Sequence, residues 1–331
     1  MSGYRDTWEC PHAPGGDDIW QESDCYWFFD PEAGIGGYHR IGQYVNQGTG
    51  QTLLFAFRQD GNRFRKLGEF SAADCTRTDT GQTVGGSSTE FLGNGCVRFT
   101  WNEADSSGDL VFSDPFYTPR SWMAEESGDE GAGAVKQRMN TGGHLEVSGR
   151  IRGELRLGKE IFPVDALAHR DRSWGNRDYR AAYQHRMVTG TIGPELSWAT
   201  YIMQLDNGHV ARAGFVARNG ITADISDVQV LAEIDYDGLS VGTLKTRLTL
   251  SDGTHVDLKG EAAQAFSVVT DDWLVSSHHF IPISGLGPPG FTIFDMTNRP
   301  SKGRYAPQPS EIATICAQDG LEPARRPFTL P

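Results

Sequence analysis

The sequence is poor in cysteine, in long apolar runs and in positive charge. Its five cysteines are widely spaced and odd in number, and they form no C-x-x-C pair. A zinc ribbon or a disulfide framework is therefore not expected, because both need regularly paired cysteines. No stretch approaches about 18 apolar residues, and the opening MSGYRDTWECPH contains no apolar segment. From the sequence we expect neither a membrane span nor a secretory signal, and hence a cytoplasmic protein with reduced cysteines.

The charge balance is acidic, with 43 acidic against 30 basic residues and a formal net charge of −13. A nucleic-acid partner needs a basic stripe, so that class is excluded and an uncharged substrate fits better. Two common enzyme signatures are missing as well. There is no G-x-S-x-G, and the Gly/Pro-rich stretch 285–290 lacks the Lys-Ser/Thr of a phosphate-binding loop. Neither an α/β-hydrolase nor a P-loop protein is expected.

Glycine, by contrast, is abundant, with 40 residues beside 16 prolines. Asn-Gly and Asp-Gly pairs are typical of type I′ β-hairpins, whose two central residues both need positive φ. Such pairs begin at Asp60, Asn94, Asn207, Asn219, Asp237 and Asp252. Between residues 207 and 253 they recur every 12 to 18 residues, which is the rhythm of a meander of antiparallel strands.

Apolar and polar residues alternate along many of the stretches between these turns. Val97, Phe99 and Trp101 alternate with polar residues, which places the three apolar side chains on one face of a strand. A chain of 331 residues exceeds the usual size of a single core. We therefore predict an all-β protein of two antiparallel barrel or sandwich domains, 18–155 and 156–300, followed by an extended C-terminal arm, 301–331. Few helices are expected; the short candidates are Ser121–Glu126 and Glu261–Phe266.

The most informative stretch is HRDRSWGNRDY, residues 169–179, which combines three arginines, two carboxylates and one imidazole around Trp174. Such a mixture is typical of a site where carboxylates are paired and shielded by aromatic side chains. The alternative is a structural ion-pair network that fastens two sheets around a half-buried tryptophan. The residues alone leave both interpretations open.

The position of Asp171 between Arg170 and Arg172 has a geometric consequence. In a strand, its side chain faces away from both arginines and shares a face with His169. We predict that the carboxylate points inward while the two guanidiniums stay at the outer or interdomain surface. Burial would then raise its pKa and allow it to donate a proton, with His169 as the acceptor. In a loop, Asp171 would instead pair with Arg177 as a structural clasp.

The segment HLEVSGRIRGELRLGKEIFPVDALAHRDRSWGNRDY, residues 144–179, resembles the central segment of the AttH-like and carotenoid 1,2-hydratase-like group of lipocalin-like proteins. In that group an RDHSWG-RDW sequence follows a segment of the form H-E--G---G. Two positions depart from the pattern: Arg172 replaces the histidine and Tyr179 replaces the final tryptophan. The N-terminal stretch Trp20 to Gly42 is also similar to the opening strand pair of the group.

The resemblance implies two lipocalin-like barrels with an apolar cavity at or near their junction. It also implies water addition to isoprenoid double bonds, cyclisation or isomerisation, without a metal or organic cofactor; lipid binding without catalysis is the alternative. The replacement at Arg172 implies another acid or base, or a different reaction. We therefore expect a cofactor-independent hydratase, dehydratase or isomerase acting on a hydrophobic small molecule, such as a terpenoid, steroid or aromatic compound. The oligomeric state stays open, with a homodimer as one alternative.

Protonating a double bond, or removing a hydroxyl as water, needs an acid in a dry pocket and aromatic faces that stabilise positive charge. The candidate catalytic residues are Asp171, His169, Asp178 and His185. The candidate substrate-binding residues are Trp174, Tyr179, Tyr183, Trp198, Tyr201 and His278.

Three further sets of residues contain histidines that are candidates for a site. His144 and Glu146 share a strand face, and either an acid–base pair or a plain hydrogen bond would fit them. His278 and His279 point to opposite faces, so at most one of them can enter a barrel. A metal site from His169, Asp171 and His185 lacks compact ligand spacing, and no metal is expected.

Overall fold

The structure is a computed structural model that describes residues 4–121, 142–205, 210–235, 239–271 and 274–298. The described chain divides into two compact units, the first ending at Arg177 and the second beginning at Asp178. The predicted arm, 301–331, lies outside the described residues, as does all of the predicted helix Ser121–Glu126 except Ser121.

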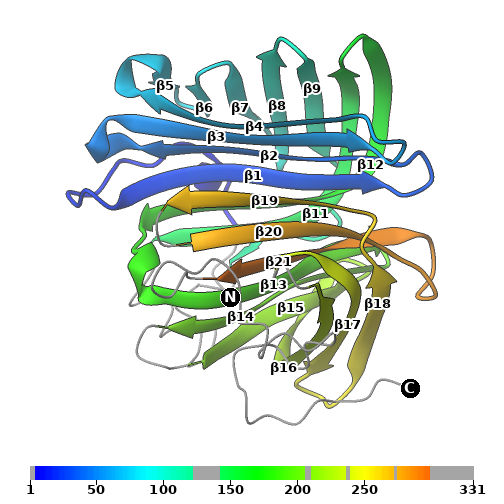
Figure 1. Cartoon of the computed structure of the whole chain (residues 1–331). Coiled ribbons are helices and arrows are strands. Elements are labelled where there is room, and N and C mark those ends of the chain that lie inside the picture. Colours follow the sequence, from blue (N-terminus) through cyan, green and yellow to red (C-terminus); the bar gives the residue numbers. More distant parts are fainter. Residues whose placement is uncertain (1–3, 122–141, 206–209, 236–238, 272–273, 299–331) are drawn as a thin grey trace. The chain divides into compact units, whose positions relative to one another are not determined.

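The first unit is a twelve-stranded antiparallel sheet that curves into a nearly closed barrel (Figure 1). Eleven strands follow one another in the order β4-β3-β2-β1-β12-β11-β9-β8-β7-β6-β5, and β10 pairs with β11. Strand β6 contacts β2 and β3, which brings the two ends of the sheet together. The strands are β1 (Trp20–Asp30), β2 (Ile35–Tyr44), β3 (Thr49–Arg58), β4 (Arg63–Ser71), β5 (Cys75–Arg77), β6 (Gly81–Val84), β7 (Ser87–Gly93), β8 (Cys96–Glu103), β9 (Ser106–Ser113), β10 (Arg120–Ser121), β11 (Gly143–Leu157) and β12 (Glu160–Asn176).

The interior of this barrel is identified by its alternating apolar residues. Val97, Phe99 and Trp101 are at most 4% exposed, as their alternation predicts. Phe99 packs against Tyr26 of β1 in a T-shaped arrangement, with ring centroids 4.3 Å apart. Side chains on β1 that share the face of Tyr26 therefore point into the barrel, and the neighbour Trp27 points outward.

The second unit is a nine-stranded antiparallel sheet in the order β18-β17-β16-β15-β14-β13-β21-β20-β19, which forms a half-barrel. Its core includes Trp198, Ile202, Val216, Val228 and Leu248. The strands are β13 (Ala182–Gly193), β14 (Leu196–Leu205), β15 (Val210–Arg218), β16 (Ile221–Ile234), β17 (Val241–Leu250), β18 (His255–Glu261), β19 (Gln264–Asp271), β20 (Leu274–Ile283) and β21 (Gly290–Asn298).

The division between the units differs from the expected boundary after residue 155. That position lies inside β11, which pairs with β12 from Gly143–Trp174 to Leu157–Glu160. Strand β12 pairs on its other side with β1, so the whole β11–β12 hairpin belongs to the first sheet. This long-range pairing moves the division to Arg177 and Asp178.

Turn chemistry and helix content agree with an all-β protein. Asn94 and Gly95 both have positive φ, at 53° and 73°, as the hairpin prediction requires. In the described part of the chain the helices are the short 3₁₀ segments η1 (Asp6–Glu9), η2 (Val45–Gln47), η3 (Ala72–Asp74) and η4 (Tyr179–Ala181). No described helix has the length and apolar character needed to cross a membrane.

The predicted helix Glu261–Phe266 is wrong. Strand β18 ends at Glu261 and β19 begins at Gln264. Between them, the backbone amide of Ala262 donates to Gly242 and that of Ala263 donates to Phe280. Hydrogen bonds to neighbouring strands thus replace the local bonds that a helix would form.

Candidate functional site

The charged run lies on β12, between β1 and β11, and its side chains alternate between the two faces of the sheet. As predicted, Asp171 faces away from Arg170 and Arg172 and shares a face with His169. The predicted direction is wrong, however. The guanidinium of Arg170 lies over the ring of Phe112, 5.2 Å from its centroid, and Phe112 pairs with Val97 of the interior face. The arginines therefore point into the barrel and Asp171 points outward.

The two arginines hold the N-terminal segment against the barrel interior. Arg170 forms a bidentate ion pair with Glu9 of η1, at 2.6 and 2.7 Å, and both side chains are fully buried. Arg172 donates to the carbonyls of Trp8 and Cys10, at 3.0 and 2.8 Å. A buried guanidinium needs such partners, because an unpaired charge in the interior is strongly destabilising.

Arg172 also neutralises two carboxylates of β1, Glu22 and Asp24, each at 2.5 Å. Trp174, on the same face of β12, stacks on His12 with ring centroids 4.0 Å apart and an interplanar angle of 8°. His12 in turn contacts Glu22 through Nδ1 at 2.8 Å. Trp174, a predicted substrate-binding residue, thus lies on the face opposite to Asp171.

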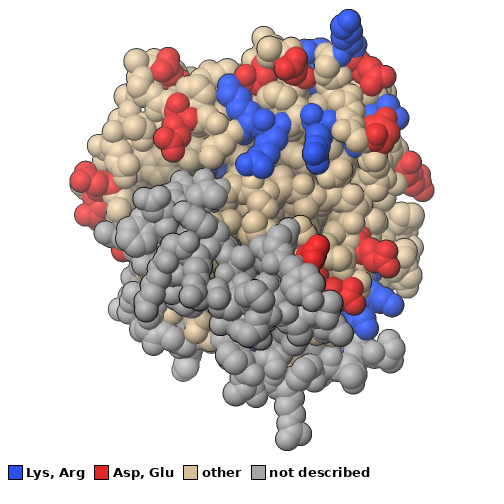
Figure 2. Space-filling model, in the orientation of Figure 1, with Lys and Arg blue, Asp and Glu red and all other residues tan. Residues whose placement is uncertain are grey.

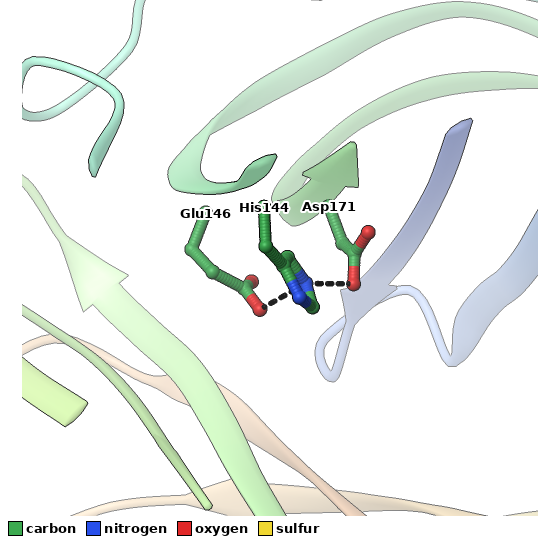
Figure 3. Close-up of side chains that lie close together, drawn as sticks. All are labelled: His144, Glu146 and Asp171. Atoms are coloured by element: carbon green, nitrogen blue, oxygen red, sulfur yellow. Dashed lines mark hydrogen bonds and ion pairs between the residues drawn. The ribbon is translucent and has the colours of Figure 1, made fainter. Parts of the chain in front are cut away.

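The outward face carries a continuous hydrogen-bonded network, the His144 network, formed by Tyr117, His144, Glu146, Ser148, His169 and Asp171. Asp171 Oδ2 lies 2.6 Å from His144 Nε2, which lies 3.1 Å from Glu146 Oε1 (Figure 3). Glu146 Oε2 lies 2.5 Å from His169 Nε2. The strand register produces this arrangement, because Glu146 pairs directly with Asp171, and His144 shares its face two residues earlier.

The far end of the His144 network orients His169. The Nδ1 atom of His169 lies 2.9 Å from the hydroxyl of Ser148. The backbone amide of Ser148 donates to the Tyr117 hydroxyl at 2.9 Å. Both nitrogens of His169 are therefore engaged, and the ring is held in one orientation.

The members of the His144 network differ in how deeply their side chains are buried. The side chains of Asp171 and His144 are 11% and 8% exposed, whereas those of Glu146 and His169 are 1% and 0% exposed. Burial lowers the pKa of His144, but Asp171 and Glu146 outweigh it and raise the pKa to about 9. Burial raises the pKa of Glu146, but hydrogen bonds from His144 and His169 outweigh it and lower the pKa to about 2. At neutral pH, His144 is therefore protonated and Glu146 is ionised.

These pKa values predict how the network contributes to stability. The contribution of His144 is fully present below its ordinary pKa of 6.5 and is lost as the pH rises through about 9. That of Glu146 is present above 4.5 and is lost as the pH falls toward about 2. We expect His144→Gln to lower the free energy of unfolding most between pH 4.5 and pH 6.5, and progressively less as the pH rises toward 9. Urea denaturation at several pH values measures this difference.

The matched control is His255→Gln, because His255 is half exposed and also precedes a carboxylate, Asp257, by two residues. Its effect on the free energy of unfolding should stay small at every pH. A His144→Gln effect that does not change between pH 6.5 and 9 contradicts a protonated His144 in the folded state.

The network also contains donor atoms suited to a divalent cation. One nitrogen of His144 and one oxygen each of Glu146 and Asp171 lie within 4.8 Å of one another. A cation there would compete with the proton on His144 Nε2, because a ligating imidazole must be neutral on that nitrogen. His144 Nε2 donates that proton to Asp171 and Glu146, which lie 2.6 and 3.1 Å away. Of His169, Asp171 and His185, only Asp171 belongs to this group; His185 lies on β13 of the second unit.

The remaining predicted residues belong to the second unit. Asp178, Tyr179 and His185 are half-buried, and the side chain of Tyr183 lies outside the described residues. Trp198 is fully buried in the core of the second sheet, where its indole donates to the Thr292 hydroxyl at 3.0 Å. The run 169–179 is thus divided between the units.

Tyr201 and His278 lie on the other face of the second sheet. His278 and His279 point in opposite directions, as predicted. His279 points toward the core and contacts the carbonyls of Phe294 and Leu239 at 3.1 and 2.8 Å. His278 instead lies 3.7 Å from Asp295. Asp295 was not recognised in the sequence, because an acidic residue in FTIFDMTN carries no motif.

On the face shown in Figure 2, basic side chains over the described residues are interspersed with acidic ones. Exposed pairs such as Arg98–Asp109 and Arg150–Asp165 are examples of this mixing in the first unit. The described part of that face therefore offers no basic stripe of the kind that binds a nucleic-acid backbone.

Two antiparallel units, one nearly closed and one half-closed, define a lipocalin-like all-β protein. The chain belongs to the family of the domain of unknown function DUF7064, whose model matches residues 5–298. No curated protein matches the chain in sequence.

Solved structures confirm the fold that the central motif indicates. The AttH protein NE1406 from Nitrosomonas europaea is 12% identical, with 88% of this chain and 95% of that chain covered and a TM-score of 0.61. CghA, solved with Sch210972, is 12% identical over 85% and 88% of the two chains, with a TM-score of 0.58. Kievitone hydratase from Nectria haematococca is 14% identical over 84% and 87%, with a TM-score of 0.56. At these identities the likeness establishes the fold.

Proposed function

We propose that this protein is a cofactor-independent enzyme that moves protons on a hydrophobic small molecule, as a hydratase, dehydratase or isomerase. The observation that carries the proposal is the buried His144 network, in which two histidines and two carboxylates form one hydrogen-bonded chain. The similarity in fold to kievitone hydratase supports the same class of reaction. Acid–base catalysis requires such a paired donor and acceptor.

The catalytic and supporting roles within the His144 network follow from how exposed each side chain is. Asp171 and His144 keep some exposure, so they are the members that a substrate can reach. Glu146 and His169 are more deeply buried; Glu146 helps to hold His144 in its protonated form, and His169 contacts the other oxygen of Glu146. Asp171 would act as the base and His144 as the acid, with their reacting atoms 2.6 Å apart on one side of the substrate.

The acid strength of His144 narrows the substrate class. An imidazolium with a pKa of about 9 is too weak to protonate an isolated double bond. It suits a hydroxyl that leaves as water from a β-hydroxy ketone, or the reverse addition of water to an enone. Asp171 removes the proton next to the carbonyl, the carbon–carbon double bond forms, and the hydroxyl leaves with the proton of His144. A terpenoid, steroid or aromatic skeleton is the hydrophobic part.

Isotope labelling tests this function. The whole chain is incubated with β-hydroxy ketones and enones on terpenoid, steroid and aromatic skeletons, in D₂O and in H₂¹⁸O, and the compounds are analysed by mass spectrometry. Incorporation of ¹⁸O into a new hydroxyl group identifies a hydratase, loss of water from a β-hydroxy ketone identifies a dehydratase, and incorporation of deuterium with neither change identifies an isomerase. Saturable binding with no isotope incorporated and no water lost overturns the enzymatic proposal and assigns a lipid-binding or lipid-transfer role.

A further inference from the structure

The N-terminal segment, residues 4–12, lies outside both sheets and is bound to the first sheet through charged side chains. The backbone amide of His12 donates to both carboxylate oxygens of Glu22, at 3.2 and 3.1 Å, and the His12 carbonyl accepts from Arg77. The two buried arginines of β12 bind the residues just before it. Neighbouring strands, in contrast, are joined by a ladder of backbone hydrogen bonds. The attachment of this segment therefore depends on a few charged side chains of the barrel interior.

Glu9 of this segment completes the charge balance of the arginine–carboxylate pairs at this end of the barrel. The described strands contribute three arginines and two carboxylates to these pairs: Arg77, Arg170, Arg172, Glu22 and Asp24. Glu9 is the third carboxylate, and it pairs with Arg170. Leaving a buried guanidinium without its carboxylate destabilises a fold strongly. Without Glu9, Arg170 would therefore move toward another partner.

Strand β12 connects this ion pair to the His144 network on the other face of the sheet. Arg170 and Arg172 directly flank Asp171 in the chain, and both bind the N-terminal segment on the interior face. On the outward face, Asp171 Oδ2 lies 2.6 Å from His144 Nε2. Close-packed interiors transmit displacements, and an acid–base pair needs its geometry held within about 0.5 Å. A movement of Arg170 is therefore expected to change the contact between Asp171 and His144.

We propose that Glu9 is a positioning residue for the acid–base pair, because its ion pair with Arg170 fixes the distance between Asp171 and His144. Glu9 acts through β12 and does not touch the reacting atoms, since it lies on the interior face and they lie on the outward face. Docking of the N-terminal segment thus sets the geometry of the His144 network. The catalytic meaning of this role rests on the proposed function, whereas the effect on geometry does not.

NMR spectroscopy of the whole chain, labelled with ¹⁵N at histidine, tests the effect on geometry. The proton on His144 Nε2 forms a charge-assisted hydrogen bond to Asp171. Such bonds are short and strong, and their protons resonate downfield of the backbone amides. Loss of the resonance in His144→Gln assigns it. We expect Glu9→Gln to move this resonance upfield or to abolish it, because the substitution leaves Arg170 without a carboxylate.

A double variant, Glu9→Leu with Arg170→Met, removes the ion pair without leaving a buried charge. Such replacements are often neutral for stability, so this variant should fold, and it too should lose the wild-type resonance. The matched control is Glu103→Gln, which removes a carboxylate from an ion pair with Lys66 on other strands of the same barrel. Its resonance should match the wild type. Circular dichroism checks the fold of each variant.

Turnover provides the second readout, on the substrate that the isotope screen identifies. Since a displacement of about 1 Å costs up to about 10²-fold, kcat of Glu9→Gln should fall by about tenfold to hundredfold while KM stays unchanged. A wild-type resonance in folded Glu9→Gln or in the double variant overturns the proposal, as does a shifted resonance in Glu103→Gln or an unchanged kcat in Glu9→Gln. If the screen finds no reaction, the proposed function fails, but the resonance still decides whether Glu9 positions Asp171.

Discussion

Asp171→Asn is expected to lower turnover by about 10²-fold or more while the fold and the affinity for substrate stay nearly unchanged. This is the usual loss when a general acid or base is removed. The asparagine can still accept a hydrogen bond from His144 Nε2, so the His144 network should keep its geometry, but it can no longer take up a proton. The measurement is kcat and KM on the substrate that the isotope screen identifies.

The control for this variant is Asp257→Asn, which removes an acidic group next to a histidine at a partly exposed position of β18. Its kcat should equal that of the wild type. Unchanged turnover in Asp171→Asn would remove Asp171 from the mechanism and transfer the role to Asp178 or His185. Loss of folding in Asp171→Asn would instead support a structural clasp.

Arg172→Met is expected to lower the free energy of unfolding by about 3–5 kcal/mol, the range for breaking a buried ion pair. The substitution leaves Glu22 and Asp24 buried without the guanidinium that now contacts both. It also removes the donor that binds the carbonyls of Trp8 and Cys10. Urea denaturation measures the loss, and faster proteolysis near residue 10 would report release of the N-terminal segment.

An exposed arginine on the neighbouring strand serves as the control. Arg150 pairs with Asp165 at the surface of the first unit, and Arg150→Met should change stability by no more than about 1 kcal/mol. Adding Asp24→Asn to Arg172→Met should recover part of the loss, because Glu22 keeps its contact with Arg77 at 2.7 Å, whereas the ion pair of Asp24 is the one with Arg172. If Arg172→Met is as stable as Arg150→Met, the buried arginine cluster does not stabilise the barrel.

The direction of Arg172 bears on its departure from the AttH-like sequence pattern. It occupies the position of the histidine in the AttH-like pattern, but its side chain points into the barrel, away from Asp171. Any acid–base role on the outward face must therefore come from other residues of the sheet. His144 and Glu146 of β11 are such residues, because they pair with Ser173 and Asp171, which lie on either side of Arg172 in β12.

Local pattern was sufficient for much of the fold. Asn94-Gly95 adopts the positive φ values that its residue types favour, and the alternation of Val97, Phe99 and Trp101 marks the interior face of β8. Alternation also placed His169 and Asp171 on one face, and His278 and His279 on opposite faces. These features depend on the period of a strand and on turn chemistry, which are properties of short segments.

Long-range pairing decided the rest. Which face of β12 points into the barrel depends on the closure of a sheet whose strands come from residues 20 to 176, so the direction of Asp171 could not be read from HRDRSWG. The partners of Arg170 and Arg172 lie about 150 residues earlier in the chain. Asp295 joins His278 and Tyr201 only through the register of β20, β21, β13 and β14. The sequence by itself determined which residue types share a face; the tertiary structure determined what each face meets, because pairing between distant strands is set by the closure of the whole sheet.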